Sequence, residues 1–116
     1  MIEVVLYDYL RSFFYDDEIP VYLERPEKKP EGEYVIIEKT GGTKTNKLAT
    51  NTFAFQSYGP TLYKASQLNE SVKGAIEAAE GLDEISSVTL NSDYNFTDTA
   101  SKSYRYQAVF VITHYE

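Results

Sequence analysis

The stretch from Glu33 to Gly59, EYVIIEKTGGTKTNKLATNTFAFQSYG, contains two β-strand patterns on either side of a polar segment. The first pattern, EYVIIEK, is rich in β-branched residues, which favour strands. The second, NTFAFQSY, alternates, so Phe53 and Phe55 should point to one face and their neighbours to the other. Glycines and lysines occupy the middle. We therefore predict two strands joined by a long polar loop centred on TGGTKTNK.

A helix pattern follows directly, in GPTLYKASQLNESVKGAIEAAEGL. Its apolar residues recur at helical spacing and form one stripe: Leu62, Ala65, Leu68, Val72, Ala75, Ile76 and Ala79. Pro60 suits the start of this helix, and Gly81 followed by Leu82 suits a glycine C-cap with its hydrophobic contact. The same spacing predicts an earlier amphipathic helix over Ile2 to Phe14.

Three further strand patterns complete the expected sheet. A short strand should run from Ile19 to about Glu24, before the turn-rich segment RPEKKPEGE. Val88 and Leu90 face the same way in a strand after the second helix. The segment from Tyr104 onward, YRYQAVFVITHYE, is a near-continuous apolar run and predicts an interior strand covered on both sides.

The elements follow one another in the order α-β-β-β-α-β-β. Because short connections favour antiparallel neighbours, we predict an α+β fold, an antiparallel and possibly mixed sheet with helices packed against it. A length of 116 residues fits a single domain, residues 1–116. The expected core comprises Phe53, Phe55, Leu68, Val72, Ile76, Val88, Leu90, Val109 and Val111.

Composition excludes several classes of function. The formal net charge is −7, whereas proteins that wrap duplex DNA usually have a basic surface. The absence of cysteine rules out disulfides, cysteine zinc sites and a cysteine nucleophile. A Ser-His-Asp triad would have to be built on His114, close to the end of the chain. Without a long apolar run or the features of a signal peptide, we expect an intracellular protein with no membrane span.

Four motifs suggest chemistry, and each has a simpler interpretation. TGGTKTNK lacks the spacing of a phosphate-binding loop, and NSDYNFTDT lacks the glycine and final glutamate of a calcium loop. YDDE, residues 15–18, suits a soluble turn, and the aromatic residues after Ser103 lack the positive groove of a single-strand binder. We therefore predict no catalytic, metal or cofactor-binding residues and no enzyme. The alternative is a small hydrolase that uses Asp93 and Asp98.

Several local segments, in their order along the chain, resemble one family of bacteriophage proteins. The segments are PVYLERP, GEYVIIEKTGG, FAFQSYGPTLYKASQLNESVKGAI and YNFTDTASKSYRYQAVFVITHY. Together with the order of elements, they resemble the tail terminators, or tail-completion proteins, of long-tailed phages and prophages. The resemblance covers nearly the full length, in a family marked by pattern and small size rather than by invariant catalytic residues.

This resemblance implies a structural virion protein without cofactor or catalysis. Such proteins are made in the bacterial host cytoplasm and form a ring, usually hexameric, at the head-proximal end of the tail tube. The ring stops tube elongation and joins the tail tube protein to the head connector protein, and DNA passes through its lumen without specific binding. The alternatives are a head-completion or adaptor protein of the same virion, and a non-phage α+β domain that binds a small molecule or peptide.

The polar loop is the expected contact with a neighbouring subunit or the tail tube. A long loop is costly to order unless something binds it, although a disordered hairpin tip is the other interpretation. The candidate contact residues are Thr43, Lys44, Thr45, Asn46, Lys47 and Leu48. Because a mobile segment over residues 41–48 would lose freedom on docking, we expect the free protein to self-associate weakly. We also expect acidic residues, rather than these lysines, to face the lumen and repel DNA.

Overall fold

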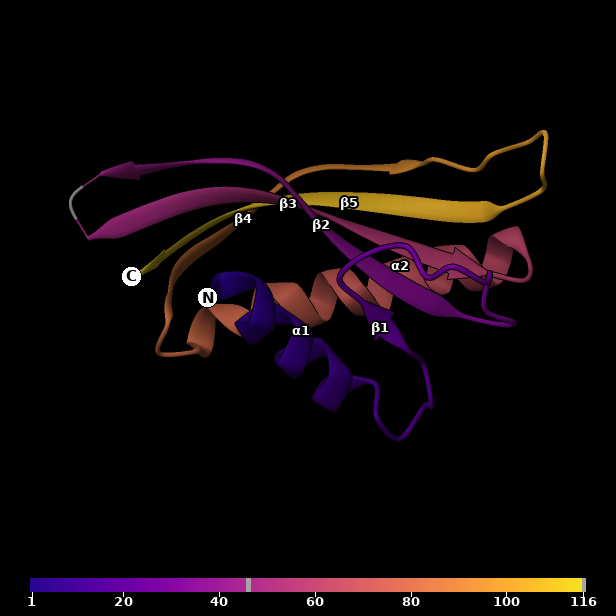
Figure 1. Cartoon of the computed structure of the whole chain (residues 1–116), viewed down its shortest axis with the longest axis horizontal. Coiled ribbons are helices and arrows are strands. Elements are labelled where there is room, and N and C mark those ends of the chain that lie inside the picture. The colour runs from indigo at the N-terminus through magenta and orange to yellow at the C-terminus, as the bar shows by residue number, and fades with distance from the viewer. Residues whose placement is uncertain (46, 116) are drawn as a thin grey trace.

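Both helices lie on one face of a five-stranded sheet in the computed structural model, which describes residues 1–45 and 47–115 (Figure 1). The helices are α1 (Ile2–Phe13) and α2 (Leu62–Ala78), and a short 3₁₀ helix, η1 (Ala79–Gly81), continues α2. The strands are β1 (Val21–Tyr22), β2 (Tyr34–Thr45), β3 (Leu48–Gly59), β4 (Ile85–Asn95) and β5 (Tyr104–Tyr115). The predicted α+β class and the order α-β-β-β-α-β-β are confirmed.

The sheet is mixed, with the strand order β1-β2-β3-β5-β4. β1 runs parallel to β2, and the other neighbouring strands are antiparallel. β5 is therefore an interior strand, as predicted. The expectation that it is covered on both sides is wrong for this chain, because α1 and α2 pack on the same face (Figure 1). On the opposite face, called the open face below, Val109 and Val111 remain partly exposed.

The core lies between the sheet and the two helices. Phe53 and Phe55 of β3 and Phe110 of β5 are fully buried there. The helices contribute Ile2, Leu6 and Leu10 from α1, and Ala65, Leu68, Val72, Ala75 and Ile76 from α2. The Tyr9 hydroxyl donates to the carbonyl oxygen of Ala75 at 2.8 Å, which ties the two helices together. Burial of these apolar side chains is the main stabilising term.

The expected core was only partly right. Its members on β3 and α2 are buried, but Leu90 is 41% exposed, and Val88, Val109 and Val111 are only partly buried. The face of β5 that packs on the helices instead carries Ala108, Phe110 and Ile112. Both faces of this strand are apolar in sequence, so periodicity alone could not tell which of them points inward.

The ends of α2 differ in part from the prediction. Thr61 is the N-cap, and its hydroxyl oxygen accepts the backbone N–H of Lys64 at 3.1 Å. Leu62 is largely exposed rather than part of the buried stripe. The predicted glycine C-cap is wrong, because Gly81 is the last residue of η1 and has no positive φ. Of the helices described, none is long and apolar enough to span a membrane.

The segment predicted as a polar loop is instead a β-hairpin arm, formed by Glu38–Thr45 of β2 and Leu48–Thr52 of β3. Its ladder continues to the pair Thr45 and Leu48, and β3 also pairs with β5 along this length. Figure 1 shows the arm projecting beyond the helices. The prediction failed because the segment is rich in threonine, a β-branched residue that suits strands, and because β5, the second partner of β3, lies far away in sequence.

Candidate assembly surface

The arm leaves one edge of β2 open. β1 pairs only with Val35 and Ile36, so within the described residues β2 has no partner on its outer side from Ile37 to Thr45. Every residue from Glu38 to Thr45 is exposed. An unpaired edge offers a row of backbone N–H and C=O groups to which another strand can add. The outer edge of the arm is therefore a surface on which a second chain can extend the sheet.

The residues predicted to contact a partner lie together at the tip of this arm. Thr43, Lys44 and Thr45 end β2, Lys47 is in the turn, and Leu48 begins β3. These five residues are exposed, whereas Asn46 lies outside the described residues. The fold thus presents them as one ordered tip, and their contact with a subunit or the tail tube remains a prediction.

β4 forms the opposite edge of the sheet and is less regular. Its register against β5 shifts between Ile85 and Ser87 and again between Leu90 and Ser92. Such irregularities bend a strand and are a common way to protect an edge from unwanted pairing. The arm and β4 therefore present two different edges, and the arm is the more regular of them over Gly41–Thr45.

A buried polar pair supports the arm from the helix side. Asn51 Nδ2 lies 2.6 Å from His114 Nε2, and His114 Nδ1 lies 3.3 Å from the carbonyl oxygen of Tyr115. This geometry fits the tautomer in which Nε2 accepts from the amide of Asn51 and Nδ1–H donates to the carbonyl oxygen of Tyr115. Gly42 is the residue opposite Asn51 and leaves room for its side chain. The single histidine thus has a structural role between β3 and β5.

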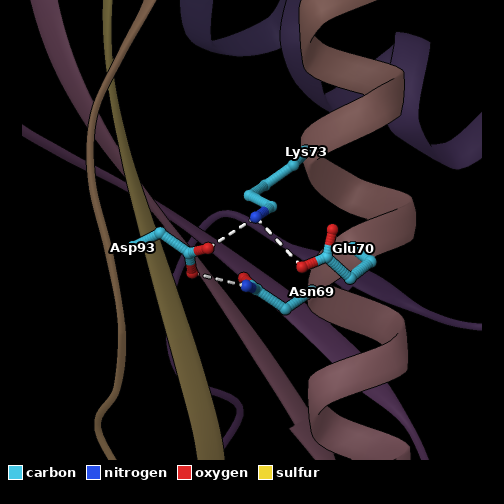
Figure 2. A network of polar contacts seen from close by, with 4 residues as sticks. All are labelled: Asn69, Glu70, Lys73 and Asp93. Carbon is cyan, nitrogen blue, oxygen red and sulfur yellow. Dashed lines mark hydrogen bonds and ion pairs between the residues drawn. The ribbon is translucent and has the colours of Figure 1, made fainter.

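The acidic residues of the hydrolase alternative have separate partners. Asp93 accepts from Asn69 Nδ2 at 2.7 Å and from Lys73 Nζ at 2.5 Å, and Lys73 also lies 3.0 Å from Glu70 Oε1 (Figure 2). The hydrogen bond to Asp93 raises the pKa of Lys73. This network joins β4 to α2, and in it each carboxylate oxygen of Asp93 accepts a hydrogen bond.

Asp98 belongs to the turn between β4 and β5. Hydrogen bonds from Ser101, with the backbone N–H of Ala100 at 3.1 Å, hold the pKa of its carboxyl below the ordinary value. Asp93 and Asp98 therefore do not share partners as an acid–base pair would. In the part of the chain that the structure describes, no three histidine, aspartate or glutamate side chains are grouped so as to hold a metal ion.

Sequence reasoning missed a cluster of tyrosines and arginines on the open face. The rings of Tyr34 and Tyr58 stack with their centroids 4.4 Å apart, and both side chains are buried. Burial raises the pKa of Tyr34. Arg25, from the β1–β2 connection, and Arg105 of β5 both donate to the Tyr58 hydroxyl. These residues are far apart in sequence, and no local motif joins them.

No protein-family model and no curated protein sequence matches this chain. The open edge of the arm and the charges around it are therefore the observations that bear on its function.

Proposed function

We propose that this chain is a structural virion protein of the tail-terminator type, which forms a ring at the head-proximal end of a phage tail tube and joins the tube to the head connector. The observation that carries the proposal is the arm, whose outer β2 edge is open and exposed over its whole length. The register of this edge shifts once, between Lys39 and Gly41, and is regular from Gly41 to Thr45. A regular open edge promotes aggregation in a monomer, so a protein that keeps one usually has a partner for it.

The arm suits a contact between non-identical surfaces. It projects from one side of the molecule (Figure 1), so its edge can reach a neighbouring subunit or the tube below. When one surface of a subunit contacts a different surface of the next copy, the contacts close into a ring if the rotation between subunits permits. Backbone pairing would supply much of the affinity, and the side chains at the tip would supply specificity.

The ordered arm changes one expectation about assembly. Weak self-association was expected because a mobile loop would lose freedom on docking, but residues 41–45 and 48–52 are already strands. A preorganised edge has a smaller ordering cost when it binds. That reason for weak self-association therefore no longer applies, and the free protein should form oligomers more readily than a protein with a mobile loop.

The charge distribution fits a ring through which DNA slides. The arm and its turn carry Lys39, Lys44 and Lys47 against Glu38, whereas the whole chain has a net charge of −7. The remainder of the protein is therefore strongly acidic. Carboxylates that line a lumen would repel the phosphates of DNA, and the lysines of the arm would face a protein partner instead.

Deletion of the gene in a phage that carries it tests the proposal. A terminator deletion should leave tails of irregular, excessive length without joined heads, as seen by electron microscopy of the lysate. Tails of normal length that fail to join heads would instead indicate the head-completion or adaptor alternative. Normal infectious particles would refute a role in the virion altogether.

A point variant tests the role of the arm separately. Lys47→Glu changes the charge at the tip, and Lys64→Glu makes the same change at an exposed position of α2. We expect both proteins to fold, and only Lys47→Glu to reproduce the tail defect of the deletion. Equal behaviour of the two variants would show that the tip makes no essential contact.

A further inference from the structure

Two of the three arginines of the chain converge on one buried phenol. Arg25 Nη2 lies 3.2 Å, and Arg105 Nη1 lies 2.9 Å, from the Tyr58 hydroxyl oxygen. Both guanidinium groups also lie near the face of the Tyr58 ring, at 5.9 Å and 5.5 Å from its centroid. Two positive charges this close repel each other, so the arrangement favours an anion beside them.

In the described part of the chain neither arginine forms an ion pair within 4.0 Å, although the charge of Arg105 helps to lower the pKa of Asp98 in the same pocket. Among residues 1–45 and 47–115, the ion pairs within 4.0 Å involve Lys73 and not Arg25 or Arg105, although acidic residues outnumber basic ones by 18 to 11. Arg105 also donates through Nε to the carbonyl oxygen of Phe96 at 3.0 Å. Both side chains keep N–H donors beyond these bonds, since a guanidinium has five.

A chain of hydrogen bonds holds the Tyr58 hydroxyl in place. Tyr58 donates to Gln56 Oε1 at 3.3 Å, Gln56 Nε2 donates to Gln107 Oε1 at 2.9 Å, and Gln107 Nε2 donates to the Tyr94 hydroxyl at 2.5 Å. All donors in this chain point away from the arginines. The phenolic oxygen is thereby free to accept from both guanidinium groups, which orients them before any ligand arrives.

A surface pocket of about 450 Å³ adjoins the two arginines. Its lining includes Lys29, Ser101 and Ser103, but also the carboxylates of Glu27 and Asp98. With three cations and two anions, the pocket suits a single carboxylate better than a doubly charged phosphate. Guanidinium groups also match the planar, two-oxygen geometry of a carboxylate.

We propose that Arg25 and Arg105 form a binding site for a carboxylate side chain of a second copy of this chain, presented by its exposed turn Asp16-Asp17-Glu18. The choice of a second copy relies on the proposed ring, and charge complementarity supports it. The three acidic residues lie in the turn after α1, are all exposed, and make no ion pair within the described part of the chain.

The turn and the pocket are separate surfaces of the molecule. The turn after α1 is at the bottom of Figure 1, and the β4–β5 connection that borders the pocket is at the upper right, with the β1–β2 connection that forms its other border between them. A chain therefore does not satisfy its own site in this structure. Contact between two different surfaces is the head-to-tail kind that builds a closed ring.

A peptide titration tests the site without any ring. The probe is FFYDDEIP, residues 13–20, added to the full chain while the arginine Nε–H signals are followed by NMR. We expect shifts at Arg25 and Arg105 but not at Arg11, and an affinity about tenfold lower for FFYNNQIP. Arg25→Gln, at an exposed position, should reduce binding about tenfold, whereas Arg11→Gln should leave it unchanged.

Equal binding of the two peptides, or binding that survives Arg25→Gln and Arg105→Lys alike, overturns the site. Because this titration involves no ring, such a result would not refute the terminator proposal, which the tail-length experiment tests. Normal tail length in the deletion, conversely, would refute the ring and not the peptide site.

Sedimentation velocity tests the choice of partner. Asp16→Asn/Asp17→Asn/Glu18→Gln removes the turn's charges, and Arg25→Gln/Arg105→Gln removes the site, so each variant alone should self-associate less than the wild type. Mixed together they should recover part of the lost self-association, because the intact arginine site of one variant can bind the intact acidic turn of the other. Self-association of both variants equal to that of the wild type, or a wild type that stays monomeric at its highest soluble concentration, overturns the second copy as partner.

Discussion

Replacing Gly42 by alanine should destabilise the protein, whereas replacing its neighbour Gly41 should not. A Cβ on Gly42 would lie 1.9 Å from Asn51 Oδ1, well inside van der Waals contact. At Gly41 no described atom lies within 4 Å of the same position. Neither glycine has a positive φ, so alanine fits the backbone at both. The two substitutions therefore differ only in what the new methyl group meets.

The size of the effect follows from the hydrogen bond that must break. To make room, Asn51 must leave His114, from which it lies 2.6 Å away in a buried position. An unsatisfied buried polar group costs about 1–3 kcal/mol. Alanine restricts the unfolded chain more than glycine does, which offsets about 0.4–1 kcal/mol. We expect Gly42→Ala to lose about 1–2 kcal/mol of unfolding free energy, and Gly41→Ala to be neutral or slightly stabilised.

Urea denaturation of the two variants measures this difference, with the imidazole NMR signals of His114 as a local report. Adding Asn51→Ala should remove the clash with that side chain and leave only the contact at 2.9 Å with the carbonyl oxygen of Thr50, so Gly42→Ala should cost less in that background than in the wild type. In a mobile loop the two adjacent glycines would respond alike. Equal midpoints for Gly41→Ala and Gly42→Ala would therefore refute the ordered arm and the role of Asn51.

Three further predictions concern the body of the protein. Ile76→Ala should lower the free energy of unfolding by about 2–5 kcal/mol, because Ile76 is fully buried. The exposed Leu90 is the control and should tolerate alanine within about 1 kcal/mol. An unchanged denaturation midpoint for Ile76→Ala would show that the α2 stripe faces solvent. The hydrogen bond to Asp93 raises the pKa of Lys73 above its ordinary 10.5. The stability that this pair contributes is therefore present below pH 10.5 and is lost as the pH rises through the pKa of Lys73 in the folded protein. Asp93→Asn should flatten this alkaline part of the curve of stability against pH, and a curve identical to that of the wild type would contradict the prediction. Calcium, magnesium or manganese should raise the melting temperature by no more than weak screening, and a shift that saturates at micromolar metal and disappears in Asp93→Asn would show a site there.

The sequence by itself determined the features that depend on local spacing. Most of the α2 stripe and the alternation of Phe53 and Phe55 follow from the periods of helix and strand, and all but Leu62 of the stripe are buried as expected. The order of elements followed from the same patterns. The hydrophobic effect is not directional, so an apolar stripe can be buried against any apolar surface. Its spacing along the chain is therefore enough to predict that it is buried.

Only the tertiary structure decided the features that depend on distant partners. The arm looks like a loop until β3 is seen paired with β5 on its other side. The inward face of β5 was set by which side the helices cover, since both of its faces are apolar. The cluster of Arg25, Tyr58 and Arg105 takes one residue from each of three separate segments. No periodic pattern in the sequence could therefore predict it. Hydrogen bonds and charges act over a few ångströms, so only the folding that brings these segments together creates the site.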